Sequence, residues 1–220
     1  MKSVLAITTL LLLSASGAAA PAWVPTDRWE PEVQTWEEQD RLNPPKPGGV
    51  LFIGSSSIRL WHTLAEDFPG VDVLNRGFGG SEIADSTELA QRIVVPYRPR
   101  MILLYAGDND LANRRTPRQV REDFSAFVTR VRKDLPDIRI AFIAIKPSLA
   151  RAHLLDKMRE ANALVREYAA SRRGVAFIDV FTPMMTPDGK VRGELFVEDG
   201  LHLNRAGYEL WKAVIAPYLR

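Results

Sequence analysis

The sequence has 220 residues, of which 46% are hydrophobic and 25% charged, and its formal net charge is +2. This balance is typical of a soluble globular domain with enough apolar side chains for one core. The basic residues are scattered along the chain, which argues against nucleic acid as a partner. The chain has no cysteine, which excludes disulfides and thiolate metal sites, and three histidines without a His-x-x-x-His pair leave little for zinc. The sequence therefore predicts catalysis with no metal and no other cofactor.

The first twenty residues have the pattern of an export signal. Lys2 precedes an apolar run over residues 4–13, and a small-residue stretch over residues 14–20 follows. A membrane-spanning helix is the alternative, but the run is shorter than the roughly 20 residues that a bilayer core requires. We therefore expect residues 1–20 to be a signal peptide. The protein should have no stable membrane span and should be exported to the periplasm or to the outside of the cell.

The segment that follows the signal predicts a short helix and a linker. Residues 30–42 place apolar side chains among charges, and Pro31 is well suited to a first helical turn. Residues 43–49 are rich in proline and glycine, which cannot continue a helix. The expected division is an N-terminal amphipathic helix and linker at residues 21–49, followed by the main domain at residues 50–220.

Short apolar runs alternate with longer helical patterns through the rest of the chain. The predicted strands are Val50–Ile53, Val71–Leu74, Met101–Tyr105, Arg139–Ile145 and Val175–Asp179. The predicted helices lie near Ile58–Leu64, Ile83–Val94, Pro117–Asp134, His153–Arg172 and Ala206–Leu219. This alternation predicts an α/β fold, a three-layer α/β/α sandwich with a five-stranded parallel sheet. In such sheets ligands bind at the carboxyl ends of the strands, so functional residues should follow directly after them.

The first predicted strand stops at Gly54 and runs into Ser55, Ser56 and Ser57, where a helix begins. A serine before a helix is commonly an N-cap, and on this segment alone the cap is the more frequent case. A serine hydroxyl at a helix N-terminus is also well placed to act as a nucleophile, because the backbone N–H groups there can stabilise an oxyanion. The segment by itself leaves both interpretations open.

Two further loops follow strand ends. The glycines of residues 75–81 mark a loop where the backbone turns tightly or approaches a ligand, and the Gly-x-Gly-x-x-Gly spacing of a dinucleotide site is absent. Residues 105–111 place Asn109 at the rim of the third strand. An Asx turn is the plain explanation for this polar cluster, and the functional one is an Asn109 amide that donates to a developing negative charge.

A carboxylate and an imidazole lie close together near the C-terminus. Asp199 and His202 are three residues apart just before the last predicted helix, so both can act on one substrate. Most loop histidines are exposed or make local hydrogen bonds, and the only other candidate pair is a looser one between His62 and Asp67.

These four segments, taken in order, resemble the SGNH hydrolase superfamily, also called GDSL-like lipases and esterases. The family's first block is Gly-Asp-Ser, with the serine as nucleophile. Gly54 matches its glycine, so the resemblance implies that Ser56 is the nucleophile. Ser55 stands where the family usually has aspartate.

The middle blocks of the family supply oxyanion donors. Its Asn-x-Gly-x-x-Gly block matches Asn75, Gly77 and Gly80, which implies that the Gly80 N–H is one donor. Its Gly-x-Asn-Asp block matches Gly107 and Asn109, which implies that the Asn109 side chain is another. The resemblance thus implies an oxyanion hole built from Gly80, Asn109 and the N–H of the nucleophile, Ser56.

The last block, Asp-x-x-His, matches Asp199 and His202 and implies a triad with Ser56. The resemblance also implies the flavodoxin-like SGNH hydrolase fold for residues 50–220. The function that follows is a secreted serine esterase that forms an acyl-enzyme and cleaves short-chain acyl or acetyl esters, with a small-molecule, carbohydrate or lipid ester as substrate. Two alternatives stay open: an acyltransferase, and a carbohydrate-binding module of the same fold without catalysis.

Three other side chains lie close to these segments in the sequence. Trp61 and Phe78 could shape an acyl pocket, but core packing is the more frequent role of such residues. Asp179 follows the fifth predicted strand, where a structural hydrogen bond is the simpler expectation.

Overall fold

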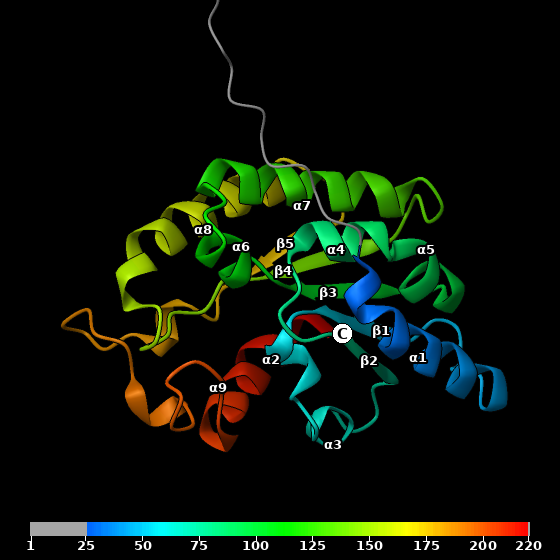
Figure 1. Cartoon of the computed structure of the whole chain (residues 1–220), viewed down its shortest axis with the longest axis horizontal. Coiled ribbons are helices and arrows are strands. Elements are labelled where there is room, and N and C mark those ends of the chain that lie inside the picture. The colour runs from blue at the N-terminus through cyan, green and yellow to red at the C-terminus, as the bar shows by residue number, and fades with distance from the viewer. Residues whose placement is uncertain (1–25, 220) are drawn as a thin grey trace, which may run out of the picture.

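The computed structural model describes residues 26–219, so the signal predicted for residues 1–20 lies outside the described residues. The chain folds into a parallel sheet between two layers of helices (Figure 1). The strands are β1 Val50–Gly54, β2 Val73–Gly77, β3 Met101–Tyr105, β4 Arg139–Ile143 and β5 Val175–Ile178. Their order in the sheet is β2-β1-β3-β4-β5. The predicted fold class, an α/β sandwich with five parallel strands, is confirmed.

Helices connect the strands in the predicted alternation. The α-helices are α1 Glu30–Leu42, α2 Ser56–Arg59, α3 Leu64–Asp67, α4 Ile83–Glu88, α5 Ala90–Ile93, α6 Asp108–Ala112, α7 Pro117–Arg132, α8 Leu155–Ala170 and α9 Arg205–Ile215. A 3₁₀ turn, η1 (Thr26–Trp29), precedes α1. The helix predicted over 83–94 is interrupted at Leu89, whose ψ of −3° leaves the α-helical range. The helix predicted near 58–64 is divided into α2 and α3 by a turn at residues 60–63, in which Trp61 is buried in the core.

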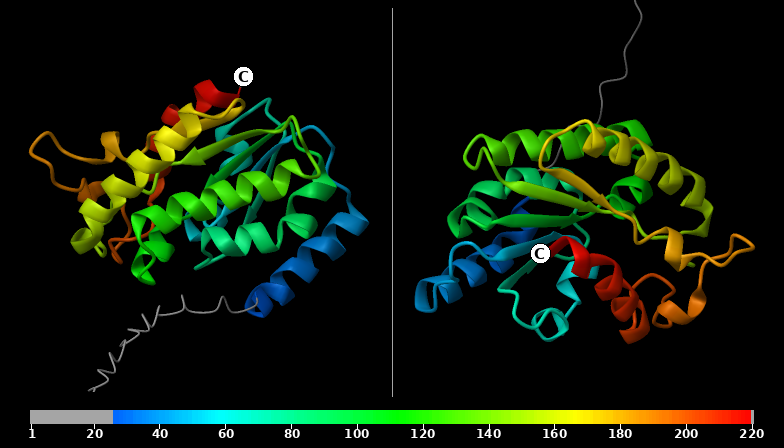
Figure 2. Two further views of the ribbon diagram at one scale, coloured as in Figure 1. Left: turned by 90° about the horizontal axis from the view of Figure 1, so that it is seen from above. Right: turned by 180° about the vertical axis from the view of Figure 1, so that it is seen from behind.

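The sheet buries both of its faces. In β1, Leu51 and Ile53 pack in one apolar cluster with α4, α5, α7 and α8, whereas Val50 and Phe52 pack in a second cluster with α2, α3 and α9. This alternation follows from the two-residue period of a strand. Figure 2 shows the two helical layers on opposite sides of the sheet. Because both faces are covered, the parallel strands read as nearly continuous apolar runs in the sequence.

Strand β2 lies further along the chain than predicted. The expected range was Val71–Leu74, but Val71 belongs to a turn in which its N–H donates to the Phe68 carbonyl. The strand instead continues through the polar residues Asn75 and Arg76. It is an edge strand that pairs with β1 alone. Backbone pairing on one side holds such a strand without a run of apolar side chains, which is why the apolar pattern misplaced it.

Asp67 joins α3 to α9, the helix that follows the His202 segment. Its carboxylate accepts hydrogen bonds from Trp61 Nε1 (2.7 Å), Thr63 Oγ1 (2.7 Å) and Arg205 Nη1 (2.7 Å). Trp61 and Asp67 are buried, while about half of the Arg205 side chain is exposed. These bonds hold the pKa of Asp67 well below its usual range, with the Arg205 hydrogen bond as the main cause.

We expect Asp67→Ala to lower the free energy of unfolding by about 2 kcal/mol, because the buried Trp61 N–H loses its acceptor while Arg205 regains water. Urea unfolding measures this change. Glu209→Ala is the matched control, since Glu209 pairs with the same guanidinium at the surface. That variant should change stability by less than about 0.5 kcal/mol. Equal effects of the two changes would contradict the assigned role of Asp67.

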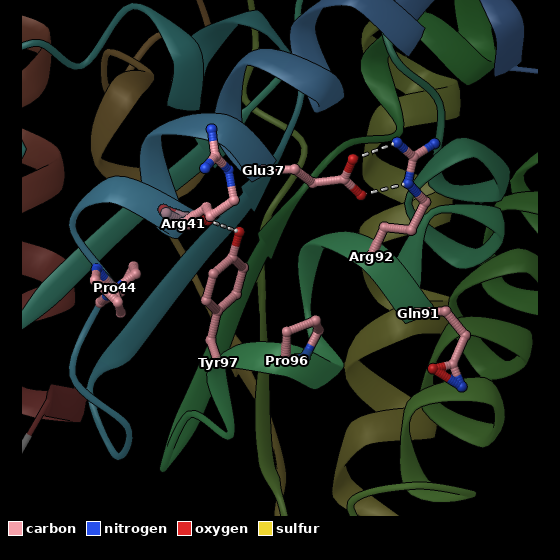
Figure 3. A pocket seen from close by; sticks show the side chains of 9 residues that line it. Glu37, Arg41, Pro44, Gln91, Arg92, Pro96 and Tyr97 are labelled. Atoms are coloured by element: carbon pink, nitrogen blue, oxygen red, sulfur yellow. Dashed lines mark hydrogen bonds and ion pairs between the residues drawn. The ribbon is translucent and has the colours of Figure 1, made fainter.

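A surface hollow of about 410 Å³ lies between α1 and α5 (Figure 3). Arg92 crosses it to bind the Glu37 carboxylate at 2.7 and 2.8 Å, and the Tyr97 hydroxyl donates to Asp40 at 2.6 Å. These bonds fasten α1 to the rest of the fold.

Over residues 26–219, none of the helices is both long enough and apolar enough to cross a membrane.

Candidate active site

The segments singled out in the sequence meet at one edge of the sheet. From β1 the chain passes to β2 on one side, whereas β3 lies on the other side of β1. This is the point where the strand order reverses, and open α/β sheets form their ligand crevice outside the carboxyl ends of the strands there. The Ser56 turn follows β1, the glycine loop follows β2, and α6 follows β3.

The turn after β1 depends on Gly54. Its φ is +122°, which favours glycine, and a Cβ at this position would lie 1.9 Å from the Tyr105 carbonyl oxygen on β3. Ser55 then extends the backbone, and Ser56 begins α2. A larger residue at position 54 would push β1 and β3 apart, so the glycine sets where the serine hydroxyls stand.

Ser56, His202 and Asp199 form a hydrogen-bonded chain. Ser56 Oγ lies 3.0 Å from His202 Nε2, and His202 Nδ1 lies 2.6 Å from Asp199 Oδ2. The Oδ1 atom of Asp199 accepts the backbone N–H groups of Leu201 (2.8 Å) and His202 (2.9 Å). These bonds fix the orientation of the carboxylate relative to the imidazole ring. The arrangement has the geometry required of a nucleophile, a general base and a group that orients the base.

The hydrogen bonds on Asp199 keep it ionised. Partial burial would raise the pKa of Asp199, but the hydrogen bonds from the backbone and ring of His202 and from the Leu201 N–H outweigh it and lower the pKa to about 2. A negative charge therefore stands beside His202 Nδ1 at neutral pH. It favours a proton on Nδ1, which leaves Nε2 free to accept one from Ser56.

Two backbone N–H groups near Ser56 are available for an anion. Gly80 adopts a φ of +75°, and its N–H makes no hydrogen bond within the described chain. The N–H of Ser56, the first residue of α2, is likewise without an acceptor among residues 26–219. Both belong to residues that the family resemblance assigns to the oxyanion hole.

The Asn109 side chain is held from both ends. Its Nδ2 donates to Ser55 Oγ (2.8 Å) and to the Ser81 carbonyl (3.0 Å), and its Oδ1 accepts from Arg151 Nη2 (2.8 Å). Both amide hydrogens are thus engaged, so an oxyanion would share one of them. The neighbouring Asp108 contributes locally, since its Oδ1 accepts the Asn109 N–H at 3.0 Å, which is not the bond to the second following residue that defines an Asx turn.

Ser55, which replaces the family's usual aspartate, acts as this acceptor. It is fully buried, and its N–H donates to the Tyr105 carbonyl at 2.8 Å. A hydroxyl accepts from Asn109 as a carboxylate would, without placing a second negative charge near Ser56. Of the three serines in the turn, Ser56 is the one whose hydroxyl contacts the His202 ring, whereas the Ser57 hydroxyl is buried near the Tyr105 side chain.

Sequence reasoning missed a buried cationic cluster behind Asn109. Asp108 Oδ2 lies 3.1 Å from Arg151 Nη1 and 3.7 Å from Lys146 Nζ, whose side chain is 1% exposed. Burial lowers the pKa of Lys146, and the Asp108 charge opposes that shift. Lys146 and Arg151 follow β4, so the rule that function lies after strand ends would have found them had it been applied to the fourth strand.

Asp110 joins α6 to the start of α4, the helix that follows the glycine loop. Its buried Oδ1 accepts the Ile83 N–H at 3.1 Å, while Oδ2 has no partner within residues 26–219. Burial raises the pKa of Asp110 to about 8, against the opposing effect of the Ile83 N–H. The folded state therefore holds a proton on this carboxyl at neutral pH.

This shift predicts how stability depends on pH. The pKa is raised on folding, so the stability that the protonated carboxyl contributes is present below about pH 4 and is lost as pH rises toward about 8. Asp110→Asn keeps the Oδ1 acceptor and removes the titration. Its unfolding free energy relative to wild type should rise between pH 5 and pH 8 by more than about 1 kcal/mol, measured by urea unfolding. A difference independent of pH would contradict the assignment.

The remaining candidate residues pack in the core or make structural hydrogen bonds. Trp61 and Phe78 are buried in the two apolar clusters. Asp179 accepts from Arg166 Nη2 at 2.7 Å and from the Thr182 N–H at 3.0 Å. Asp67, the carboxylate considered for His62, is occupied by the bonds described above. Within the described part of the chain, no three His, Cys, Asp or Glu side chains gather as metal ligands do.

Several solved structures share this fold. A Streptococcus pneumonia protein provisionally described as a platelet activating factor superposes with a TM-score of 0.77 at 23% identity, over 88% of this chain and 94% of that one. A GDSL-like lipase from Bacteroides thetaiotaomicron gives 0.70 at 16% identity, over 85% and 96%. A Clostridium thermocellum family 3 carbohydrate esterase gives 0.60 at 15% identity, over 80% and 98%.

At these identities the likenesses show the fold, and no curated protein matches the sequence. The model of one sequence family does match, over residues 54–210, which span the serine turn, the glycine loop, Asn109 and the Asp199–His202 pair. The chain belongs to the GDSL-like lipase/acylhydrolase family.

Proposed function

We propose that this protein is an exported serine esterase that removes short acyl groups through an acyl-enzyme on Ser56. The observation that carries the proposal is the continuous contact from Asp199 through His202 to Ser56, with 2.6 Å on one side of the imidazole and 3.0 Å on the other. Family membership supports the ester-cleaving chemistry.

In the proposed reaction, His202 Nε2 takes the Ser56 proton while Oγ attacks the ester carbonyl carbon. The carbonyl oxygen becomes an oxyanion and accepts from the N–H groups of Ser56 and Gly80 and from the Asn109 amide. Collapse of this intermediate breaks the bond to the alcohol, which leaves with the proton from His202. Water, activated by the same imidazole, then attacks the acyl-enzyme and releases the acid and the free serine.

Short acyl groups fit the surroundings of Ser56. The side chains of His202 and Asp199 are 27% and 46% exposed, so the site opens directly to solvent. Leu149 and Val197 are exposed apolar side chains on the segments beside this site, and Leu149 lies against Gly200. Such an edge contacts a small acyl chain without enclosing it. The likeness to a family 3 carbohydrate esterase makes sugar esters the first class to test.

Export is proposed from the N-terminal sequence: Lys2, the apolar run over residues 4–13 and the small residues before Pro21. N-terminal sequencing of the protein recovered from the periplasm or the medium tests this point. A start near residue 21 supports it, and a chain retained in the cytoplasm with Met1 in place contradicts it.

The experiment for the function is a comparison of p-nitrophenyl acetate, butyrate and palmitate together with an acetylated sugar. We expect the highest kcat/KM on the shortest esters. Labelling with a fluorophosphonate and peptide mapping should place the adduct on Ser56. No turnover of any ester and no adduct would favour a binding module, while preferential transfer of the acyl group to an added sugar alcohol would favour an acyltransferase.

A further inference from the structure

The turn η1 contacts the glycine loop that bears one of the proposed oxyanion donors. Trp29 Nε1 donates to the carbonyl oxygen of Gly79 at 3.1 Å, although the two residues are 50 positions apart in the sequence. The Trp29 side chain is buried, with 6% of the residue exposed. The contacted carbonyl belongs to the peptide unit that links Gly79 to Gly80, so Trp29 bonds to the same peptide whose N–H is the donor.

The geometry of this peptide unit determines where that N–H points. No cis peptide occurs in the described chain, so the Gly79 carbonyl and the Gly80 N–H point in opposite directions in one plane. A hydrogen bond from Trp29 to the carbonyl therefore directs the N–H away from Trp29. It also withdraws electron density from the carbonyl, which makes the N–H a stronger donor.

Arg28 fixes the next peptide unit. Its Nη2 donates to the Gly80 carbonyl at 2.6 Å, and its guanidinium lies 3.6 Å from the centroid of the Trp29 ring. Gly80 is thus held on both sides of its Cα, by Trp29 through the preceding peptide and by Arg28 through the following one. A glycine at φ +75° has wide conformational freedom, and these two bonds select one conformation.

Apolar contacts hold Trp29 in place. Its ring packs edge-on against Phe78, with centroids 5.2 Å apart, and Phe78 in turn donates its N–H to the Gly54 carbonyl at 2.8 Å. Gly54 ends β1, two residues before Ser56. The indole is therefore tied through Phe78 to the strand that positions the nucleophile.

We infer that Arg28 and Trp29 are positioning residues that set the Gly79–Gly80 peptide so that the Gly80 N–H donates to the oxyanion. The inference rests on the proposed esterase function, because it concerns a step of that reaction. It makes the segment before α1 a support of the proposed oxyanion hole, acting through the Gly79–Gly80 peptide.

The decisive variant is Trp29→Phe, which keeps an aromatic ring against Phe78 and removes the N–H. Loss of a whole oxyanion donor costs about 10² to 10³ in turnover, and a donor that is present but less well aimed should cost about 10-fold in kcat. The KM should change by less than about 2-fold, since ground-state binding does not use the donor. Arg28→Gln, at an exposed position, should lower kcat by about 3-fold for the same reason.

The matched control is Trp36→Phe. Trp36 lies on α1 and also packs edge-on against Phe78, at 6.4 Å between centroids, and its indole N–H has no hydrogen-bond partner within residues 26–219. This variant loses the same atoms from the same aromatic group without losing a hydrogen bond. We expect its kcat and thermal midpoint to match those of wild type.

Inhibitor affinity is a second readout, which separates a change in the direction of the Gly80 N–H from a general loss of order in the site. An alkyl trifluoromethyl ketone adds to Ser56: the Oγ–carbon bond forms, the carbonyl electron pair becomes an oxyanion, and the serine proton moves to His202. Trp29→Phe should weaken this inhibitor by the same factor, about 10-fold, by which it lowers kcat/KM.

The outcomes are distinct. An active wild type, with Trp29→Phe and Arg28→Gln both unchanged in kcat and inhibitor affinity, would overturn this inference and leave the esterase function standing. The same would follow if Trp36→Phe lost as much activity as Trp29→Phe. If Trp29→Phe did not fold, Arg28→Gln would decide by itself. A wild type inert toward all esters would defeat the proposed function, and this inference with it.

Discussion

Ser56→Ala is expected to reduce kcat on a short-chain ester by about 10⁴-fold or more, with the fold intact. The change removes only the hydroxyl group that His202 contacts, so no acyl-enzyme can form at this position. The activity that remains would come from direct attack of water on the ester, with the oxyanion donors stabilising the intermediate. Burst kinetics with p-nitrophenyl acetate should lose both the burst and the steady-state rate.

Ser57→Ala is the matched control for this variant. Ser57 is the next residue on α2, and its buried hydroxyl lies near the Tyr105 side chain and away from the His202 ring. Its loss should change kcat by less than about 3-fold, because the hydroxyl does not contact His202. The assignment of Ser56 fails if Ser56→Ala keeps a tenth of the activity, or if the loss follows Ser57 instead.

Asp199→Asn should lower kcat by about 10³-fold. An asparagine can offer its NH₂ to His202 Nδ1, which favours the tautomer with the proton on Nε2, and that tautomer cannot accept the serine proton. In a buried triad the corresponding change costs about 10⁴. Asp199 is 46% exposed, and water screens part of its charge, so we expect a smaller loss here.

The control for Asp199→Asn is Glu198→Gln, which removes the same charge one residue earlier, at an exposed position. The control should retain wild-type kcat. Measuring both variants in low and moderate salt separates the loss of orientation, which persists, from a general change in surface charge, which salt screens. Equal losses in the two variants would show that the charge acts from a distance and that the hydrogen bond to the ring is unimportant.

The sequence predicted the fold well because the sheet is buried on both faces. The strand Met101–Tyr105 has the predicted bounds, since each of its residues is buried and the apolar run ends where the sheet ends. The edge strand β2 was misplaced because it continues through the polar residues Asn75 and Arg76, which do not extend the apolar run. The other edge strand, β5, keeps an apolar run and ends only one residue before its predicted end. Local pattern thus locates strands by their apolar side chains, whether they are central or at an edge.

The candidate site was predictable to the extent that its residues follow strand ends. Ser56, Asn109 and the Asp199–His202 pair all do so or precede a helix, and their order matched a known family. The supporting side chains were not predictable. Arg151 reaches Asn109 across 42 residues and Trp29 reaches Gly79 across 50, and no spacing rule relates such pairs. Their contacts depend on the paths of two loops, which only the folded backbone determines.

The separation of Ser56 from His202 has a consequence for the timing of activity. The two residues lie 146 positions apart, and strands β2 to β5 all come between them. A nascent chain therefore carries Ser56 through most of synthesis without His202, the proposed base. The contact between the two side chains can form only after all five strands have been synthesised. Under the proposed mechanism, the polypeptide gains esterase activity only at the end of its synthesis.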